Sequence, residues 1–235
     1  MIQRAKKKDK HPVMNKPAFW KKDWFIALVI SIALLAVSGS APIVSLERAA
    51  YDWGLQSSSE EPSDRIAVIA KSASALDYAH KQNVVHRDIK PANIMWDPDS
   101  NELKITDFGI ARITDSSKTK TGVVLGTPSY MPPEQLPGKK IDGRSDLFSL
   151  GVMFYQMLTG GLPFSGDSMA TLMYKIANEE PTKASELNAK LPPEIDEIIA
   201  KALAKDADAR YQSGSEMAKA LKECVAKIKA RQSGS

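Results

Sequence analysis

The segment His86-Arg87-Asp88-Ile89-Lys90-Pro91-Ala92-Asn93, followed by Asp107-Phe108-Gly109, decides the interpretation of this 235-residue chain. Asp88 and Asn93 stand five positions apart, and Asp107 follows after a short hairpin-like stretch. One carboxylate in such a set can accept the proton of an attacking hydroxyl, while the amide and the other carboxylate offer oxygen ligands to Mg²⁺. A His-Arg-Asp triplet alone is weak evidence, because it can occur by chance. Here the triplet is followed by Lys90, Asn93 and Asp107 at the spacings given above. The pattern therefore favours phosphoryl transfer.

These two segments resemble the catalytic and metal-binding loops of protein kinases. The run Lys90-Pro91-Ala92-Asn93 resembles that of the Ser/Thr class. The resemblance implies a mainly α (α+β) fold, namely the C-terminal lobe of a kinase. It also implies transfer of a phosphoryl group from ATP, with Mg²⁺, to a Ser or Thr of a protein substrate.

The resemblance assigns a role to each polar residue of the candidate site. Asp88 is the expected catalytic base, and Lys90 is expected to stabilise charge on the transferring phosphoryl group. Asn93 and Asp107 are the expected Mg²⁺ ligands, so Lys90, Asn93 and Asp107 together hold the nucleotide. Thr127 resembles the threonine that contacts the catalytic Asp and Lys. Considered alone, Asp88 would be interpreted as a turn or cap residue.

Regulatory residues are also implied by the resemblance. Arg87, beside the catalytic Asp, resembles an arginine that pairs with a phosphate on the activation segment. The candidate phosphorylation sites are Ser116, Ser117, Thr119 and Thr121, of which Thr119 or Thr121 is preferred. At least two of these four are expected to be ordinary loop hydroxyls.

Further residues are expected to have structural roles. Glu134 resembles the buried acid of the family, with Arg210 as its partner, because a buried charge without a partner is costly. Asp146 is a third structural residue and stands at the start of a helix expected to run to about residue 158. Pro132 stands where Ala or Ser is usual, which removes an N–H and stiffens the turn. The histidines of this region, His80 and His86, are expected to be packed rather than metal-binding.

The net charge of +4 is unevenly distributed. Residues 1–23 contain eight Lys/Arg and two Asp, so the remainder of the chain sums to −2. The excess of positive charge therefore lies in the N-terminal tail, residues 1–23, and no nucleic-acid partner is expected. The single cysteine, Cys224, cannot form an internal disulfide and is expected to be packed in a helix.

A membrane span is predicted directly after the basic tail. Residues 24–44 contain no charge, and 16 of these 21 residues are apolar. As a helix they would be about 31 Å long, enough to cross a bilayer. A cleaved signal peptide is the alternative, but the long basic leader favours an uncleaved single-pass anchor in the inner or plasma membrane. The positive-inside rule places residues 1–23 in the cytoplasm.

The stretch after the span predicts a change of domain. Residues 45–67 resemble the opening of the extracytoplasmic CHASE2 sensor domain of bacterial Ser/Thr kinases, and are interpreted as a stub of it. Within them, residues 57–64 are expected to be a loop, and 65–70 a short buried strand. From about Val68 the apolar spacing becomes helical, so the kinase lobe is predicted over 68–229, with a disordered tail at 230–235.

Within the lobe, two short strands are predicted at 94–96 and 103–105, on either side of a turn. Helices are predicted at 146–158, 168–178, 193–203 and 215–229. Residues 147–166 lack charge but contain four glycines and a proline, so a buried helix and a loop are favoured over a second span.

The small ATP-binding lobe of a kinase is not recognisable before Asp88. No Gly-rich loop occurs there, and Lys71 is too close to Asp88 to be the nucleotide-binding strand Lys. With one span, moreover, the kinase lobe would fall outside the cytoplasm, whereas in an intact relative it would be cytoplasmic. We therefore expect a sensor kinase that has lost an internal segment and is inactive as written. The alternative is a catalytically dead, membrane-tethered binding module derived from a kinase.

Overall fold

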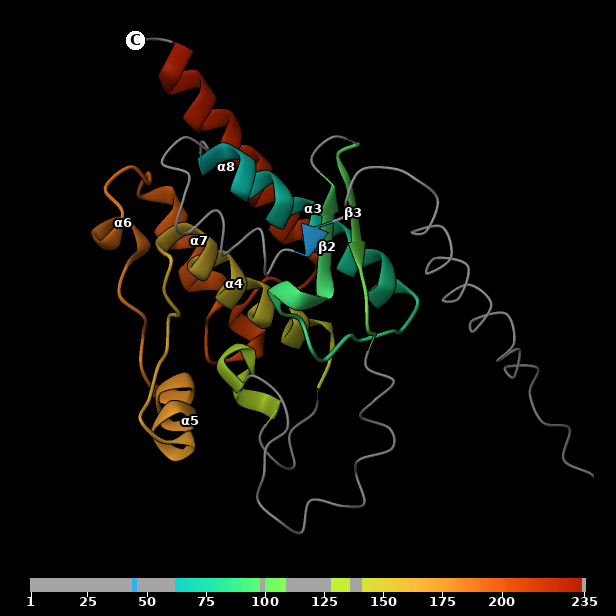
Figure 1. Ribbon diagram of the computed structural model, residues 1–235, viewed down its shortest axis with the longest axis vertical. Coiled ribbons are helices and arrows are strands. Elements are labelled where there is room, and N and C mark those ends of the chain that lie inside the picture. Colours follow the sequence, from blue (N-terminus) through green and yellow to red (C-terminus); the bar gives the residue numbers. More distant parts are fainter. Residues whose placement is uncertain (1–43, 46–61, 98–99, 109–127, 136–140, 234–235) are drawn as a thin grey trace, which may run out of the picture. The chain divides into compact units, whose positions relative to one another are not determined.

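The computed structural model describes residues 44–45, 62–97, 100–108, 128–135 and 141–233 (Figure 1). The elements in chain order are β1 (Val44–Ser45), α3 (Pro62–Lys81), η1 (Pro91–Asn93), β2 (Ile94–Asp97), β3 (Glu102–Ile105), η3 (Pro128–Tyr130), η4 (Pro133–Gln135), α4 (Gly143–Thr159), α5 (Met169–Asn178), α6 (Ala184–Leu187), α7 (Glu194–Ala202), η5 (Ala207–Ala209) and α8 (Gly214–Ser233).

Helix α4 is the centre of the core. Nearly every residue between Ser145 and Leu158 is buried, as expected for a helix that is apolar on all sides. Its bounds follow from its caps: the side chain of Asp142 accepts from the Arg144 N–H at 3.0 Å, and Gly160 ends it with a left-handed φ of 78°. The prediction of a buried helix followed by a loop in this uncharged stretch is confirmed.

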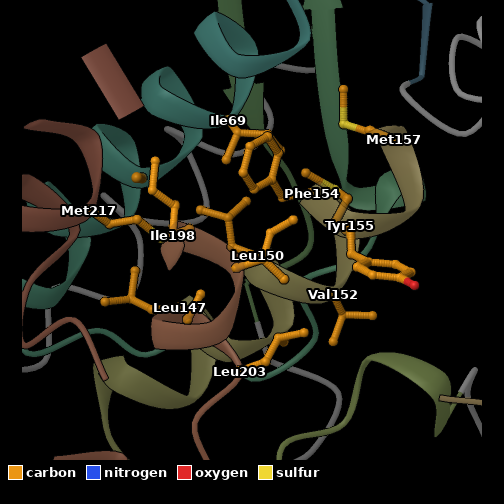
Figure 2. Close-up of a cluster of buried hydrophobic side chains, with 14 of the residues drawn as sticks. Ile69, Leu147, Leu150, Val152, Phe154, Tyr155, Met157, Ile198, Leu203 and Met217 are labelled. Carbon is orange, nitrogen blue, oxygen red and sulfur yellow. The ribbon is translucent and has the colours of Figure 1, made fainter. Parts of the chain in front are cut away.

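Three other helices pack around α4. Figure 2 shows apolar side chains of α4 meeting those of α3, α7 and α8, namely Leu147, Leu150, Val152 and Phe154 of α4 with Ile69, Ile198 and Met217. All seven are buried. The core therefore joins residues that are up to about 150 positions apart in the sequence.

Helix α3 corrects the predicted start of the helical region. The expected loop at 57–64 and strand at 65–70 are wrong where the structure describes them, because the helix already begins at Pro62. Proline suits the first helical turn, where its missing N–H has no partner to lose, and Asp64 complements the helix dipole there. Ile66, Ile69 and Ala73 then recur at helical spacing and are fully buried. The short apolar run from Ile66 to Ala70 fits both the strand period and the helical period, and its packing in the core selects the helix.

Helices α3 and α8 lie side by side with very close backbones (Figure 1). A Cβ on Gly214 would lie 2.1 Å from the carbonyl oxygen of Ala73, so only glycine fits there. The carboxylate of Asp77 accepts from the backbone N–H of Ser215 at 3.1 Å and also from its hydroxyl. Asp77 of α3 thus caps the first turn of α8.

The sheet has the strand order β1-β2-β3 and is antiparallel throughout. In the β2–β3 hairpin, Ile94 pairs with Ile105, which confirms the two predicted strands. Val44, predicted as the last residue of the membrane span, is in β1 and pairs with Trp96. Residues 24–43 lie outside the described residues. Among the residues that the structure describes, no helix combines the length and hydropathy needed to cross a membrane.

Lys71 lies on α3, not on a strand. Its ammonium donates to the carbonyl oxygen of Asn101 at 2.8 Å and stands 4.5 Å from the centre of the Trp96 ring. Lys71 therefore ties α3 to the β2–β3 hairpin, and its exclusion as the nucleotide-binding strand Lys is confirmed.

The remaining helices follow their sequence signals closely. Helices α5 and α7 confirm the predictions for 168–178 and 193–203 within one residue at each end, whereas α6 was not predicted. Helix α8 continues to Ser233, so the predicted disorder is wrong for 230–233. Residues 226–232 are mostly Ala, Lys, Arg and Gln, which favour helix, and Arg231 pairs with Glu194 of α7.

Candidate active site

The candidate catalytic loop leaves α3 through a left-handed residue, Asn83, with a φ of 59°. Asparagine tolerates this conformation better than most residues do. The loop contains a second left-handed residue, Arg87, with a φ of 68°. An arginine keeps such a φ only where its surroundings fix the backbone.

The carboxylate of Asp146 provides that fixation. It is only 1% exposed, in the first turn of α4. Its oxygens accept from the backbone N–H of His86 at 2.8 Å and of Arg87 at 2.7 Å. His80 Nε2 donates to the same carboxylate at 2.8 Å. Three donors thus satisfy a buried charge and lock the loop to the central helix.

His86 links the catalytic loop to the segment that contains Asp107. Its Nε2 donates to the carbonyl oxygen of Thr106 at 2.8 Å, and its ring lies 4.7 Å from that of Phe108. The N–H of Asp88 points at His86 Nδ1 at 3.3 Å, so Nδ1 is the acceptor. The neutral tautomer with the proton on Nε2 fits both contacts.

Asp88, Lys90 and Asn93 lie in mutual contact. The Lys90 ammonium is 2.9 Å from Asp88 Oδ2, and Asn93 Nδ2 donates to Asp88 at both its carbonyl oxygen (2.8 Å) and Oδ2 (3.2 Å). Asn93 is buried, whereas the Asp88 side chain is 44% exposed. Within the described part of the chain, Asp88 Oδ1 accepts no hydrogen bond. The carboxylate is therefore held through Oδ2, while the side chain as a whole stays partly exposed.

Asp107 lies beside Asn93. The backbone N–H of Thr106 donates to the carbonyl oxygen of Asn93 at 2.9 Å, and the Thr106 hydroxyl donates to it at 3.3 Å. Asp107 itself is exposed, with a left-handed φ of 58°. Because Asn93 Nδ2 is engaged with Asp88, its Oδ1 is left to act as a ligand. An amide and a carboxylate oxygen suit Mg²⁺, which usually takes few protein ligands and completes its shell with phosphate oxygens and water.

The described residues contain no group of three or more His, Cys, Asp or Glu side chains that could hold a metal ion alone.

Comparison with known proteins identifies the family. The profile of the protein kinase domain matches residues 46–223, which is more than half of the chain. The chain belongs to the protein kinase family. The match begins inside the stretch interpreted as a sensor stub, residues 45–67.

The similar proteins are bacterial kinases. The chain is 45% identical over 159 residues to the serine/threonine-protein kinase PknB of Mycolicibacterium smegmatis, covering 66% of this chain and 25% of that protein. It is 46% identical over 146 residues to the probable serine/threonine-protein kinase PknB of Bifidobacterium longum, covering 61% and 21%. The chain thus spans about a quarter of the length of the curated relatives that it matches.

A solved structure gives the same fold. The crystal structure of the Mycobacterium tuberculosis PknI kinase domain aligns with a TM-score of 0.60 at 24% identity, over 79% of this chain and 64% of that one. The likeness is in fold alone, and it agrees with a helix-rich, C-terminal portion of the kinase fold.

Several predicted residues of this kinase lie outside the described residues. They are Ser116, Ser117, Thr119, Thr121 and Thr127. Arg87, expected to pair with a phosphate on one of the first four, is exposed, and its carbonyl oxygen accepts from Gln135 Nε2 at 3.0 Å. The Gln135 contact, like the role of His80 in binding Asp146, has no signal in the sequence, because both depend on distant residues.

Glu134 and Arg210, predicted to pair, lie in contact within the kinase fold. Arg210 is 1% exposed and donates to both carboxylate oxygens, at 2.6 and 2.8 Å, while the Ser145 hydroxyl donates to Glu134 at 2.7 Å. Burial alone would raise the pKa of Glu134, but the hydrogen bonds and charge of Arg210, with the Ser145 hydroxyl, outweigh it and lower that pKa. Pro132 is buried just before η4 and does not prevent this pairing.

Proposed function

We propose that the chain carries the catalytic lobe of a Ser/Thr protein kinase, which transfers a phosphoryl group from Mg-ATP to a hydroxyl of a protein substrate. The observation that supports it best is the cluster of Asp88, Lys90 and Asn93, in which the partly exposed Asp88 carboxylate is held through Oδ2. Family membership and the named relatives agree with this chemistry.

Each residue would act by position and charge. Asp88 Oδ1 would accept the proton of the substrate hydroxyl while its oxygen forms the new bond to phosphorus. Lys90 would stabilise negative charge on the transferring group. Asn93 Oδ1 and the Asp107 carboxylate would hold Mg²⁺, which supplies charge neutralisation for the phosphates. Thr127 would orient the Asp88–Lys90 pair.

The chain as written is proposed to be inactive. No Gly-rich loop precedes Asp88 in the sequence, and Lys71, the only mimic of the strand Lys, is engaged with Asn101 and Trp96. Without these parts the γ-phosphate is not positioned. The test is transfer of radiolabelled phosphate from ATP to a generic basic protein. Transfer that Asp88→Asn abolishes would refute the proposed inactivity and support the site.

A chimera separates the site from the missing part. A small lobe from a bacterial relative, fused before Pro62, should restore transfer that depends on Asp88 and Asp107. In this chimera Asp107→Asn should remove Mg²⁺-dependent turnover. Cys224→Ser, which changes a buried thiol far from the cluster, should leave turnover near normal. Equal losses in both variants would show that the site is misassigned.

The second candidate function is a catalytically dead, membrane-tethered binding module. The observation that favours it is that the loop contacts around Asp88 form entirely within the described lobe, so the substrate-facing surface needs no small lobe. Capture of one protein from a library by the inactive chain, with no dependence on ATP or Mg²⁺, would favour this module over an enzyme.

Regulation and location complete the proposal. Arg87, exposed beside the site, would pair with a phosphate on Thr119 or Thr121 and order the activation segment. Residues 24–43 would anchor the chain in the membrane, since Val44 pairs within the sheet, with 1–23 cytoplasmic and 45–67 derived from a CHASE2-type sensor. Two reporters fused after Ser235, one active only inside the cytoplasm and one only outside, test the topology. A signal from the inside reporter alone would rule out this orientation.

A further inference from the structure

Positive charge is concentrated in α8 between residues 219 and 231. Between residues 219 and 231 there are five cations and one acid, a net charge of +4. The cations are Lys219, Lys222, Lys227, Lys229 and Arg231, and the acid is Glu223. Because residues 24–235 sum to −2, the rest of that region carries −6. The net charge of residues 219–231 is therefore opposite in sign to that of the rest of residues 24–235.

The cations surround a flat, exposed strip. Ala226 and Ala230 are four residues apart and exposed, so they share the solvent side of the helix. Lys222 and Lys229, seven residues apart, lie on one flank of this strip, and Lys227 lies on the other. The exposed pair of Lys219 and Glu223 lies along the strip itself, with Glu223 on the side of Lys227. We call this strip and its three lysines the basic face of α8.

The opposite side of the helix fixes the orientation of the basic face. Leu221 and Cys224 are buried, and Val225 and Ile228 pack against the core. At the far end, Arg231 pairs with Glu194 of α7. The basic face is thus held outward by packing, so that it does not have to be ordered when it meets a partner.

Two of the five cations form ion pairs, and three do not pair with any described residue. Lys219 lies 3.9 Å from Glu223, and Arg231 is engaged with Glu194. Lys222, Lys227 and Lys229 form no ion pair with any residue that the structure describes. The pKa of Glu194 on α7 is lowered, chiefly by the hydrogen bonds from Arg231 and to a smaller extent by the charge of Lys227.

We propose that the basic face of α8 docks on an anionic lipid surface. Alanines at the centre of the strip allow close approach, while long lysine side chains at its edges reach phosphate headgroups. A nucleic acid is a poorer fit, because the face has no aromatic residue on which a base could stack and is only a few helical turns long. The predicted span at 24–44 would hold the lobe near such a surface. The inference does not depend on kinase activity.

The test uses the full chain in lipid nanodiscs of phosphatidylcholine, with or without phosphatidylserine. A fluorophore on Ala226→Cys reports proximity through quenching by nitroxide-labelled lipids. Cys224 can stay, because it is buried and burial raises the pKa of its thiol, which keeps it unreactive. A fluorophore on Ala189→Cys, exposed between α6 and α7, is the control site.

We expect quenching at position 226 only in discs that contain phosphatidylserine, with loss of quenching at high salt. Lys222→Gln with Lys229→Gln should lower the docked-to-free ratio by about thirtyfold, since each cation near such a surface contributes about 1 kcal/mol. Lys183→Gln with Lys190→Gln removes the same charge from another exposed region and should change little.

Two results would overturn the proposal. One is equal quenching at position 226 in neutral and anionic discs, or quenching that the Lys222 and Lys229 substitutions leave intact. The other is a fluorescence response of position 226 to duplex or single-stranded DNA at lower concentration than to anionic lipid, which would assign the face to nucleic acid.

Discussion

Replacing Arg210 by Met should strongly destabilise the lobe, because it leaves a buried carboxylate without its partner. Arg210 is 1% exposed and makes two hydrogen bonds to Glu134, as well as donating to the carbonyl oxygen of Ala204 at 2.7 Å. Removing one member of a buried ion pair typically costs about 3–5 kcal/mol. For a chain of this size that corresponds to a fall in Tm of roughly 6–20 °C.

A double variant tests the reason for the loss. In Arg210→Met, a second change of Glu134→Gln removes the uncompensated charge and keeps a group that can bond the Ser145 hydroxyl. The double variant should therefore recover a large part of the lost stability. The free energy of unfolding would be measured by chemical denaturation of the full chain in detergent. Arg231→Met, which breaks the surface pair with Glu194, is the matched control and should have a much smaller effect.

The pH dependence gives an independent check. The folded-state pKa of Glu134 lies below the ordinary value of 4.5, so its pairing stabilises the fold above that pH and the contribution is lost as pH falls. The stability gap between the wild type and Arg210→Met should therefore narrow below about pH 4.5. A gap that is constant with pH, or a double variant no more stable than Arg210→Met, would refute the ionic explanation and point to lost packing.

Three further changes can be followed by the same unfolding measurement, and the first two of them test the contact between α3 and α8. Asp77→Ala should lower the free energy of unfolding by about 2 kcal/mol at neutral pH. Burial alone would raise the pKa of Asp77, but Lys81 and Ser215 lower it from 3.8 to about 2. The stability difference between the wild type and this variant should therefore fade as pH falls below 3.8. Gly214→Ala should destabilise by about 1–3 kcal/mol through the close α3–α8 contact, and no loss would contradict that contact. Lys205→Met should not lower the free energy of unfolding at neutral pH. Because burial lowers the pKa of Lys205, the stability of the wild type should rise as pH approaches 10.5, whereas the stability of the variant should not.

Residue identity and spacing were enough to propose the candidate site, but not enough to fix the local structure around it. The segment from His86 to Asn93 could be found because phosphoryl transfer needs particular side chains at particular spacings, and these survive in the sequence. The start of α3 could not, since the run from Ile66 to Ala70 fits a strand and a helix equally well. Only its packing on α4 and α8 selects the helix.

The roles of His80 and Gln135 show the second limit. Each contacts a partner some 50 to 65 residues away, His80 at Asp146 and Gln135 at the carbonyl oxygen of Arg87. Neither contact follows from periodicity, because periodicity reports the face of an element and not its neighbour. The departure at Pro132 is a similar case: the missing N–H suggested a disturbed turn, yet the adjacent Glu134 still reaches Arg210.

The contacts that shape the catalytic loop all arise within the lobe. Asp146 of α4 holds the backbone at His86 and Arg87, Asn93 holds Asp88, and Thr106 joins Asn93 to the segment of Asp107. None of these donors or acceptors belongs to a nucleotide-binding element upstream of α3. The loss of a small lobe would therefore remove affinity for ATP while leaving the proposed base and the proposed metal ligands in position. A chimera should consequently regain activity without any change in the loop around Asp88. The chimera therefore tests the need for a small lobe and not the folding of the candidate site.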